Sequence, residues 1–414
     1  MYHYPNLIRL RAALCADWLP QRVMKACLSF AFLVSATVLA AAEPACLVYV
    51  GTYTDWELLV PVHHNPPGER SQGIYVFRLD PASGVLAPLG LAAETTNPTY
   101  VTFSPSGRFL YAVNEIYEFQ GQPTGTVSAF AIDAKSGRLT FLNRMPSHGT
   151  GPCHAVVDPS GKNLLVANFG SGSASVLPLA PDGTLRPASA VEQDTGSGPN
   201  PRQAGPHTHS FNVSPDNRFA VAAQFGTDKL SVFRFDAAAG SLAPADPPSV
   251  ALKPGSAPRH FAFHPNGAVA YALNEIDSTV TVLAYDGPRG TFRPLQNVST
   301  LPDDYRGRNT AAEVLVHPSG KFLYASNRGQ DSIAVFAVDA EGRLKPLAHV
   351  PSGGRTPRGF CLDPAGRWLI AANQDTHNIA VFAIDQKTGL PAPTGQSLPV
   401  RSPVGVKVLS LSAQ

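Results

Sequence analysis

Charge is scarce in this 414-residue chain. Only 15% of its residues are Asp, Glu, Lys or Arg, and the formal net charge is +2. Proteins that bind nucleic acids or anionic membranes usually carry a strongly basic surface, so this balance argues against both kinds of partner. The apolar content of 44% is too high for a disordered chain. A compact folded protein fits these numbers better.

Long apolar runs are also lacking, with one exception near the N-terminus. Residues 28–42 read LSFAFLVSATVLAAA, follow Arg22 and Lys25, and end in small residues. Fifteen apolar residues fall short of the roughly 20 that span a bilayer, so a cleaved secretory signal is favoured over an uncleaved anchor. We therefore expect a signal peptide over residues 1–42 and a mature chain over 43–414. That chain would be periplasmic or secreted, without membrane association. A start at Met24 would make residues 1–23 an upstream extension.

Cysteine is the third scarce residue type. Removing the signal takes away Cys15 and Cys27 and leaves Cys46, Cys153 and Cys361, an odd number without metal-ligand spacing. Such a set allows one disulfide at most and excludes a disulfide scaffold. Buried apolar thiols are the favoured interpretation.

Glycine and proline, by contrast, are abundant, at 35 and 39 residues, and they punctuate a repeat. Each repeat unit holds an apolar strand, a Pro-x-Gly-type turn, a second apolar strand and then Asn or Gln. The turn prolines recur every 46 to 56 residues, at Pro105, Pro159, Pro215, Pro265, Pro318 and Pro364. Alternating third strands such as residues 229–236, and fourth strands after Gly-containing turns, complete each unit. Four antiparallel strands per 50 residues predict propeller blades.

Six complete units are visible, and a seventh is split between the two ends of the chain. Residues 47–53, 73–79 and 85–91 supply three strands, and residues 403–409 resemble the missing innermost strand. Joining the ends in one blade closes the ring and removes exposed sheet edges. The sequence therefore predicts an all-β fold, a seven-bladed β-propeller with four antiparallel strands per blade and a closing blade shared by the termini. It forms a single domain over 43–414.

Antiparallel pairing places the start of each first strand and the end of each second strand on the same rim. The first-strand positions are Tyr100, His154, His209, His260, Glu313 and Arg358. The second-strand positions are Asn114, Glu115, Asn168, Gln224, Asn274, Glu275, Asn327, Arg328, Asn373 and Gln374. Loops that enter first strands add Arg202, His207, Arg259 and Arg308. This rim, rich in imidazole, guanidinium and carboxylate, is the expected functional face.

Repeated residues on either rim have a simpler explanation. The Asn that recurs at one position of each blade is expected to hydrogen-bond its own blade's loops. His264 and His317 stand where other blades have Ser or Asp, so they are expected to cap turns on the opposite rim. The non-repeating residues are the better candidates for function, although ion pairs that serve structure alone would gather similar residues. They are His207, His209, Arg259, His260, Glu275, Glu313, Arg328 and Arg358.

Two kinds of chemistry are disfavoured. His207 and His209 would point to the same side of a strand, as zinc ligands do, but no third ligand has characteristic spacing and the nearby arginines oppose a cation. No Gly-x-Ser-x-Gly motif supports a serine nucleophile. We expect no metal and no organic cofactor.

The segment 198–219, GPNPRQAGPHTHSFNVSPDNRF, together with APRHFAF, ALNE, AAEV and SNRGQ, resembles the lactonase propeller family. That family includes cycloisomerase-type 6-phosphogluconolactonases and the carboxy-cis,cis-muconate lactonizing enzyme, and the resemblance runs from about Val48 to Leu409. It implies a catalytic site that falls on His209, Arg259, Glu275 and Arg328. The expected substrate-binding residues are His207, His154, His260, Arg308, Glu313 and Arg358. Departures from the family pattern include Gln224 and a long insertion at 56–72, which would cover the mouth.

The resemblance implies hydrolysis of a sugar-type lactone, a small and anionic substrate. Arginines would bind its anionic group and polarise the carbonyl, while Glu275 or His209 activates water. A phosphorylated gluconolactone belongs to the cytoplasm, so predicted export favours an unphosphorylated lactone. Two alternatives stay open: a muconate-type cycloisomerase, and a non-catalytic propeller that binds a partner at the cell surface or in the periplasm.

Overall fold

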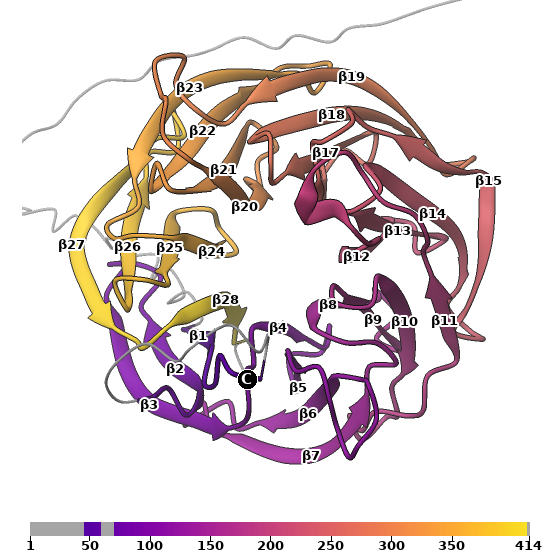
Figure 1. Cartoon of the computed structure of the whole chain (residues 1–414). Helices are drawn as coiled ribbons and strands as arrows, with labels where there is room; N and C mark the ends of the chain where they lie inside the picture. Colours follow the sequence, from indigo (N-terminus) through magenta and orange to yellow (C-terminus); the bar gives the residue numbers. More distant parts are fainter. Residues whose placement is uncertain (1–44, 59–69, 412–414) are drawn as a thin grey trace, which may run out of the picture. The chain divides into compact units, whose positions relative to one another are not determined.

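The computed structural model describes residues 45–58 and 70–411, so the predicted signal segment and most of the 56–72 insertion lie outside the described residues. Within these ranges the regular structure is almost wholly strand. The one helical element there is a single 3-10 turn, η1 (Pro201–Gln203). The strands form seven sheets of four antiparallel strands, arranged around a common centre (Figure 1). The predicted seven-bladed β-propeller is confirmed.

Six sheets follow one another along the chain, and in each the first strand is innermost. The first two are β4 (Tyr100–Phe103), β5 (Phe109–Asn114), β6 (Thr126–Ile132), β7 (Leu139–Pro146), and β8 (Pro152–Val157), β9 (Asn163–Asn168), β10 (Ser173–Pro178), β11 (Ala190–Gln193). The next two are β12 (Thr208–Val213), β13 (Phe219–Gln224), β14 (Lys229–Asp236), β15 (Ser241–Ala251), and β16 (Pro258–Phe263), β17 (Val269–Asn274), β18 (Thr279–Asp286), β19 (Thr291–Ser299). The last two are β20 (Thr310–Val316), β21 (Phe322–Arg328), β22 (Ser332–Val338), β23 (Leu344–Pro351), and β24 (Pro357–Leu362), β25 (Trp368–Asn373), β26 (Asn378–Ile384), β27 (Pro391–Pro399).

The seventh sheet joins the two ends of the described chain. Its order is β28 (Pro403–Ser410), β1 (Cys46–Thr52), β2 (Gly73–Leu79) and β3 (Leu86–Glu94). The C-terminal strand β28 is innermost and pairs antiparallel with β1, with Val48 opposite Val408. The split closing blade is therefore confirmed, with strand bounds close to the predicted ones.

The core is divided among the interfaces between neighbouring sheets. Within the described residues, seven apolar clusters each join one sheet to the next around the ring. In one of them, Val221 and Ala223 of β13 pack with Phe261 of β16 and Ala272 of β17. Because each blade completes its neighbour's apolar core, the ring supplies a rigid frame for whatever lies on its rim.

The rim opposite the candidate site is built for structure. His264 accepts a hydrogen bond from the Asn266 amide and donates through Nε2 to the carbonyl of Gly320, at 3.1 and 2.8 Å. His317 makes the same pair of bonds within its own turn and to Gly366. Each histidine thus caps its own turn and fastens it to the next blade, as the sequence predicted.

The recurring asparagines also do what their repetition indicates. Asn168 donates to the carbonyl of Ser147 at 3.0 Å, and Asn327 donates to the carbonyl of Thr300 at 2.7 Å. Both carbonyls belong to the loop that enters the same blade. These side chains hold the loops of the expected functional face in place, and the candidates for chemistry are their non-repeating neighbours.

Candidate active site

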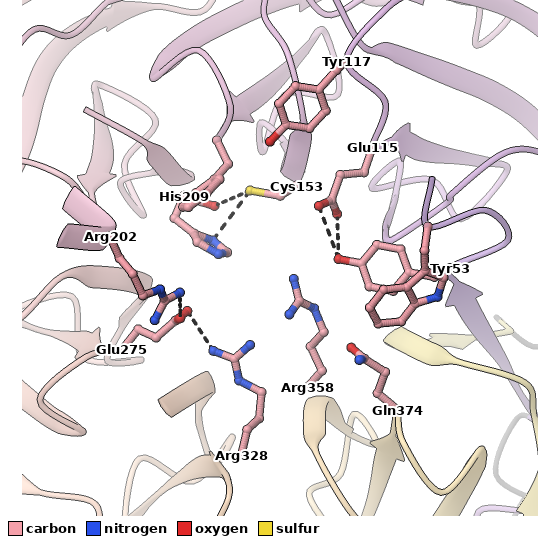
Figure 2. A pocket seen from close by; sticks show the side chains of 12 residues that line it. Tyr53, Glu115, Tyr117, Cys153, Arg202, His209, Glu275, Arg328, Arg358 and Gln374 are labelled. Atoms are coloured by element: carbon pink, nitrogen blue, oxygen red, sulfur yellow. Dashed lines mark hydrogen bonds and ion pairs between the residues drawn. The ribbon is translucent and has the colours of Figure 1, made fainter. Parts of the chain in front are cut away.

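A cavity of about 400 Å³ opens on the rim where first strands start and second strands end, which is the expected functional face. All seven blades contribute to its lining. Its side chains come from first-strand starts, second-strand ends and the loops beside them, as the antiparallel pairing requires (Figure 2). The lining residues are Tyr53, Trp56, Glu115, Tyr117, Cys153, Phe169, Arg202, His209, Glu275, Arg328, Arg358 and Gln374. Four of the predicted site residues, His209, Glu275, Arg328 and Arg358, therefore meet around one space.

One side of the cavity is organised by Glu275, which directly follows β17. Its Oε2 lies 3.0 Å from Arg259 Nε and 2.8 Å from an Arg328 terminal nitrogen, while Oε1 lies 2.5 Å from Arg202. Although burial alone would raise it, these three guanidinium groups hold the pKa of the Glu275 carboxyl well below its usual range. A carboxylate held in this way is a poor acceptor of protons. It is well suited to fix the positions of arginines.

Two of these arginines also bind the main chain of the blade β20–β23, to which Arg328 itself belongs and which follows the blade of Arg259. Arg259 donates to the carbonyl of Ala312, and Arg328 donates to the carbonyl of Ala311 at 3.1 Å. These carbonyls lie where β20 departs from regular pairing with β21, between Ala311 and Val314. The arginines thus satisfy main-chain acceptors that the irregular strand leaves without ladder partners. Part of their role is to join two blades.

Arg358, at the start of β24, is the exception among the cavity arginines. Within the described part of the chain its guanidinium forms no hydrogen bond or ion pair. It lies over the Tyr53 ring, with Cζ 5.5 Å from the ring centroid, and it borders both the cavity and a smaller void below. Its N–H donors are directed to a space that a substrate would fill, as Figure 2 shows.

His209 lies in β12 and is 5% exposed. The Cys153 thiol donates to the main-chain carbonyl of His209 at 3.2 Å, and its sulfur lies 3.6 Å from His209 Nδ1. Burial, together with the charges of Arg259 and Arg358 and the ring of His260, lowers the pKa of His209 well below its ordinary value. The imidazole is therefore neutral at neutral pH.

Glu115 lies across the cavity from Glu275 and directly follows β5. Both of its carboxyl oxygens are 3.3 Å from the Tyr53 hydroxyl. Burial is the largest influence on its pKa, and it raises the pKa of the Glu115 carboxyl above its ordinary value against the opposing charge of Arg358. Two glutamates on opposite sides of one cavity thus have pKa values shifted in opposite directions.

A second layer of polar side chains lies deeper in the channel. His260 Nδ1 is 2.8 Å from Glu313, and the Lys407 ammonium is 4.7 Å from the Tyr100 ring centroid. The His154 and His260 ring centroids are 5.4 Å apart. Burial lowers the pKa of His260 to about 4 despite Glu313. Of the expected substrate-binding residues, His154, His260 and Glu313 thus lie beneath the cavity and do not line it.

Two other expected substrate-binding residues lie away from the cavity. His207 precedes β12 in a left-handed backbone conformation with a φ of 51°, and its ring stacks on Phe169 at a centroid distance of 4.7 Å. In a regular strand residues 207 and 209 would point to the same side. His207 lies before the strand, and it does not line the cavity as His209 does. Arg308 is exposed in the loop before β20 and does not line the cavity.

Residues 47–408 match the family described as lactonase, 7-bladed beta-propeller. The chain belongs to this lactonase family. A 6-phosphogluconolactonase from Bacillus subtilis is 38% identical over 316 residues, which cover 76% of this chain and 84% of that protein. A 6-phosphogluconolactonase from Formosa agariphila is 35% identical over 324 residues, covering 76% and 86% of the two chains.

A solved structure extends this similarity to the whole propeller. The periplasmic gluconolactonase of Pseudomonas aeruginosa superposes with a TM-score of 0.80 at 35% identity, covering 88% of this chain and 99% of that one. The names of these relatives support a lactonase enzyme, and they describe neither of the alternatives that the sequence left open. Among residues 45–58 and 70–411, no helix of this lactonase-family chain has the length and apolar character needed to cross a bilayer.

The cavity is also lined by residues that sequence reasoning did not select. Tyr53 and Trp56 follow β1, Cys153 lies in β8, and Glu115 was recognised on the rim without being chosen. Trp56 opens the 56–72 insertion and packs on Tyr53 with ring centroids 4.8 Å apart. Glu115 had one available signal, because it follows an Asn as Glu275 does. Across the described ranges, no three His, Cys, Asp or Glu side chains gather as metal ligands.

Proposed function

We propose that this protein hydrolyses a sugar-type lactone, with His209 as general base and Arg358 as the group that binds the developing oxyanion. One observation carries the proposal: a neutral imidazole and an unpaired guanidinium border the same water-accessible cavity. Relatives named for lactone hydrolysis support the same reaction class.

His209 is oriented for proton acceptance. The polar neighbour of its ring is the Cys153 sulfur, which lies 3.6 Å from Nδ1. A proton on Nδ1 leaves the lone pair on Nε2, which no described residue engages. Nε2 would remove a proton from the attacking water.

Arg358 acts at the carbonyl. When water attacks, negative charge develops on the carbonyl oxygen, and a guanidinium already in place stabilises it without reorganisation. Arg328 and Arg202, fixed by Glu275, border the same space and add positive potential. Glu275 is thereby a positioning residue in this proposal, since its lowered pKa leaves it little basicity.

The charge balance of the site indicates the substrate class. Four arginines (Arg202, Arg259, Arg328 and Arg358) and three glutamates (Glu115, Glu275 and Glu313) line the cavity and the void beneath it, and the buried His154 and His209 are neutral. A lactone with a carboxylate or phosphate group would balance the excess positive charge. Export, predicted from residues 1–42, favours an unphosphorylated substrate in the periplasm or outside the cell. No cofactor is required by the proposed steps.

The test is a pH-stat assay of the purified protein against D-glucono-1,5-lactone, its 6-phosphate and a uronic acid lactone. We expect turnover of at least one lactone and a loss of roughly 100-fold or more in kcat for His209→Asn, because general base catalysis contributes 10²–10⁴-fold. His148→Asn, an exposed histidine on the loop before β8, is the matched control. No turnover of any lactone would refute the function, and full activity of His209→Asn would refute the role of His209.

A further inference from the structure

Two glutamates occupy the same blade position on opposite sides of the cavity. Glu115 follows Asn114 at the end of β5, and Glu275 follows Asn274 at the end of β17. Glu275 is 3% exposed and lies within ion-pair distance of three arginines. Glu115 has no ion pair with any described residue, and its carboxyl group is hydrogen-bonded by the neutral hydroxyl of Tyr53. When environments push two carboxyl groups apart in this way, they serve different chemical roles.

Glu115 is placed to reach both ends of the reaction. It borders the main cavity, and it also borders the small void beneath, which it shares with His209 and Arg358. Figure 2 shows His209 and Glu115 facing each other across the space, with the Arg358 guanidinium between them. A lactone whose carbonyl oxygen meets Arg358 therefore has His209 on one side and Glu115 on the other.

Lactone hydrolysis needs a proton donor as well as a base. Breaking the acyl–oxygen bond of a lactone releases an alkoxide, which is a poor leaving group unless it is protonated as it departs. Glu275 is held ionised by its arginines and has no proton to give. The Tyr53 hydroxyl is engaged by Glu115.

We propose that Glu115 is the general acid that protonates the leaving ring oxygen. This inference rests on the proposed lactonase function and adds a catalytic residue to it. Burial raises the pKa of Glu115, which keeps a larger share of the carboxyl group protonated. The Tyr53 hydroxyl lies 3.3 Å from both carboxyl oxygens, so it can donate to whichever oxygen carries no proton and leave the O–H of the other free for the substrate.

Hydrolysis then proceeds through a tetrahedral intermediate. A water O–H bond breaks, its proton moves to His209 Nε2, and the oxygen bonds to the lactone carbonyl carbon while the π pair moves to the carbonyl oxygen at Arg358. The oxyanion then reforms the carbonyl, the bond to the ring oxygen breaks, and that oxygen takes the electron pair and the Glu115 proton. The product is the open hydroxy acid. A proton moving from His209 to Glu115 restores the enzyme.

The small void beneath the cavity provides a path for the proton that moves from His209 to Glu115. It measures about 20 Å³ and is lined by Glu115, His209, His260 and Glu313 among others. A polar void of this size has room for about one water molecule. Such a water would connect His209 with Glu115 without passing through bulk solvent.

The experiment compares Glu115→Gln with the wild type on a matched pair of substrates, a lactone and its ring-sulfur thiolactone. A thiolate needs no protonation to leave, so the acid matters only for the oxygen lactone. We expect kcat to fall by roughly 100-fold on the lactone and by roughly threefold or less on the thiolactone, as loss of a general acid predicts. The high-pH limb of the wild-type lactone profile, where Glu115 loses its proton, should be missing in the variant. Glu118→Gln, an exposed glutamate on the same loop, is the matched control and should behave like wild type.

The possible results distinguish a wrong role for Glu115 from a wrong lactonase function. A wild type that hydrolyses neither substrate refutes the lactonase function itself. If the wild type is active and Glu115→Gln keeps its rate on the lactone, Glu115 is not the acid and the function stands. Equal losses on lactone and thiolactone would also overturn the proposal, because they indicate a positioning role. Retained thiolactone turnover shows that the variant is folded.

Discussion

The two sides of the cavity differ more than their sequences do. On the side of blades β16–β19 and β20–β23, the glutamate after the strand-end asparagine is fixed by three arginines, two of which also bind main-chain carbonyls. On the side of β1 and β4–β7, the equivalent glutamate touches a tyrosine hydroxyl and an open space. The same residue at the same blade position therefore becomes a fixed anion in one place and a proton-exchanging group in the other. Neighbours from other blades decide which.

The largest expected effect is a loss of stability when the Glu275 carboxylate is removed. Glu275→Gln leaves Arg259 and Arg328 buried without their carboxylate, and losing one member of a buried ion pair costs about 3–5 kcal/mol. The exposed Arg202 adds little to this figure. Urea unfolding at pH 7 should show the loss. Glu115→Gln breaks no ion pair, so it should lower the free energy of unfolding far less. Equal decreases in the two variants would contradict the difference drawn between Glu115 and Glu275.

Arg358→Gln should instead impair activity with little change in stability. Removing one donor to an oxyanion typically costs 10²–10³-fold in kcat, so we expect a loss of roughly 100-fold. Arg358 has no hydrogen bond or ion pair with described residues, so the urea midpoint should hold. Arg328→Gln is the contrasting variant, since it should lower both kcat and the urea midpoint. A large stability loss in Arg358→Gln would show that its role is structural.

Acidification should destabilise the protein through the buried histidines. Burial lowers the pKa of His154, His209 and His260, the last to about 4, below the ordinary value of 6.5. For a group whose folded pKa is depressed, stability is complete above the unfolded pKa and falls as pH drops toward the folded pKa. A single histidine that stays neutral in the folded state lowers the free energy of unfolding by about 2 kcal/mol as the pH falls from 6.5 to 5. Urea titrations at both pH values test this, and His260→Gln should flatten the dependence.

The smallest effect is expected for Tyr53→Phe. The Tyr53 hydroxyl stabilises the ionised form of Glu115 and so lowers its pKa, and a hydrogen bond of this kind contributes about 1 kcal/mol. Its removal should move the high-pH limb of the lactone profile upward by less than about one unit. Activity near neutral pH should change by roughly threefold or less. A downward shift of the limb would contradict the assignment of that limb to Glu115.

Much of this architecture follows from local patterns. The Pro-x-Gly turns and alternating strands report pairing between neighbours in sequence, so they predicted seven blades and a closing blade built from both ends. Antiparallel pairing then predicts that His209, Glu275, Arg328 and Arg358 lie on one rim, where the structure has them. These predictions depend on strand direction alone, which the repeat specifies.

The distinction between Glu115 and Glu275 was beyond such reasoning. Both follow an asparagine at a strand end, and the residues that separate their acidities come from elsewhere: Arg202 lies 73 positions before Glu275, and Tyr53 lies 62 positions before Glu115. His207 was misplaced for a local reason, since a left-handed residue before β12 interrupts the alternation assumed for His-x-His. The signal segment and the roles of the expected site residues stay predictions.

The pairing of β28 with β1 has a consequence for how the chain is made. Strand β1, a buried apolar segment, is the first described strand to be synthesised, and its inner neighbour β28 is the last. Until translation reaches residue 410, the first blade keeps an unpaired apolar edge, the kind of edge that recruits other chains. The ring, its channel and the Lys407 that β28 places there are therefore completed only after residue 410 has been synthesised. A chain that stops before β28 would lose the inner partner of β1 and with it the closure of the ring.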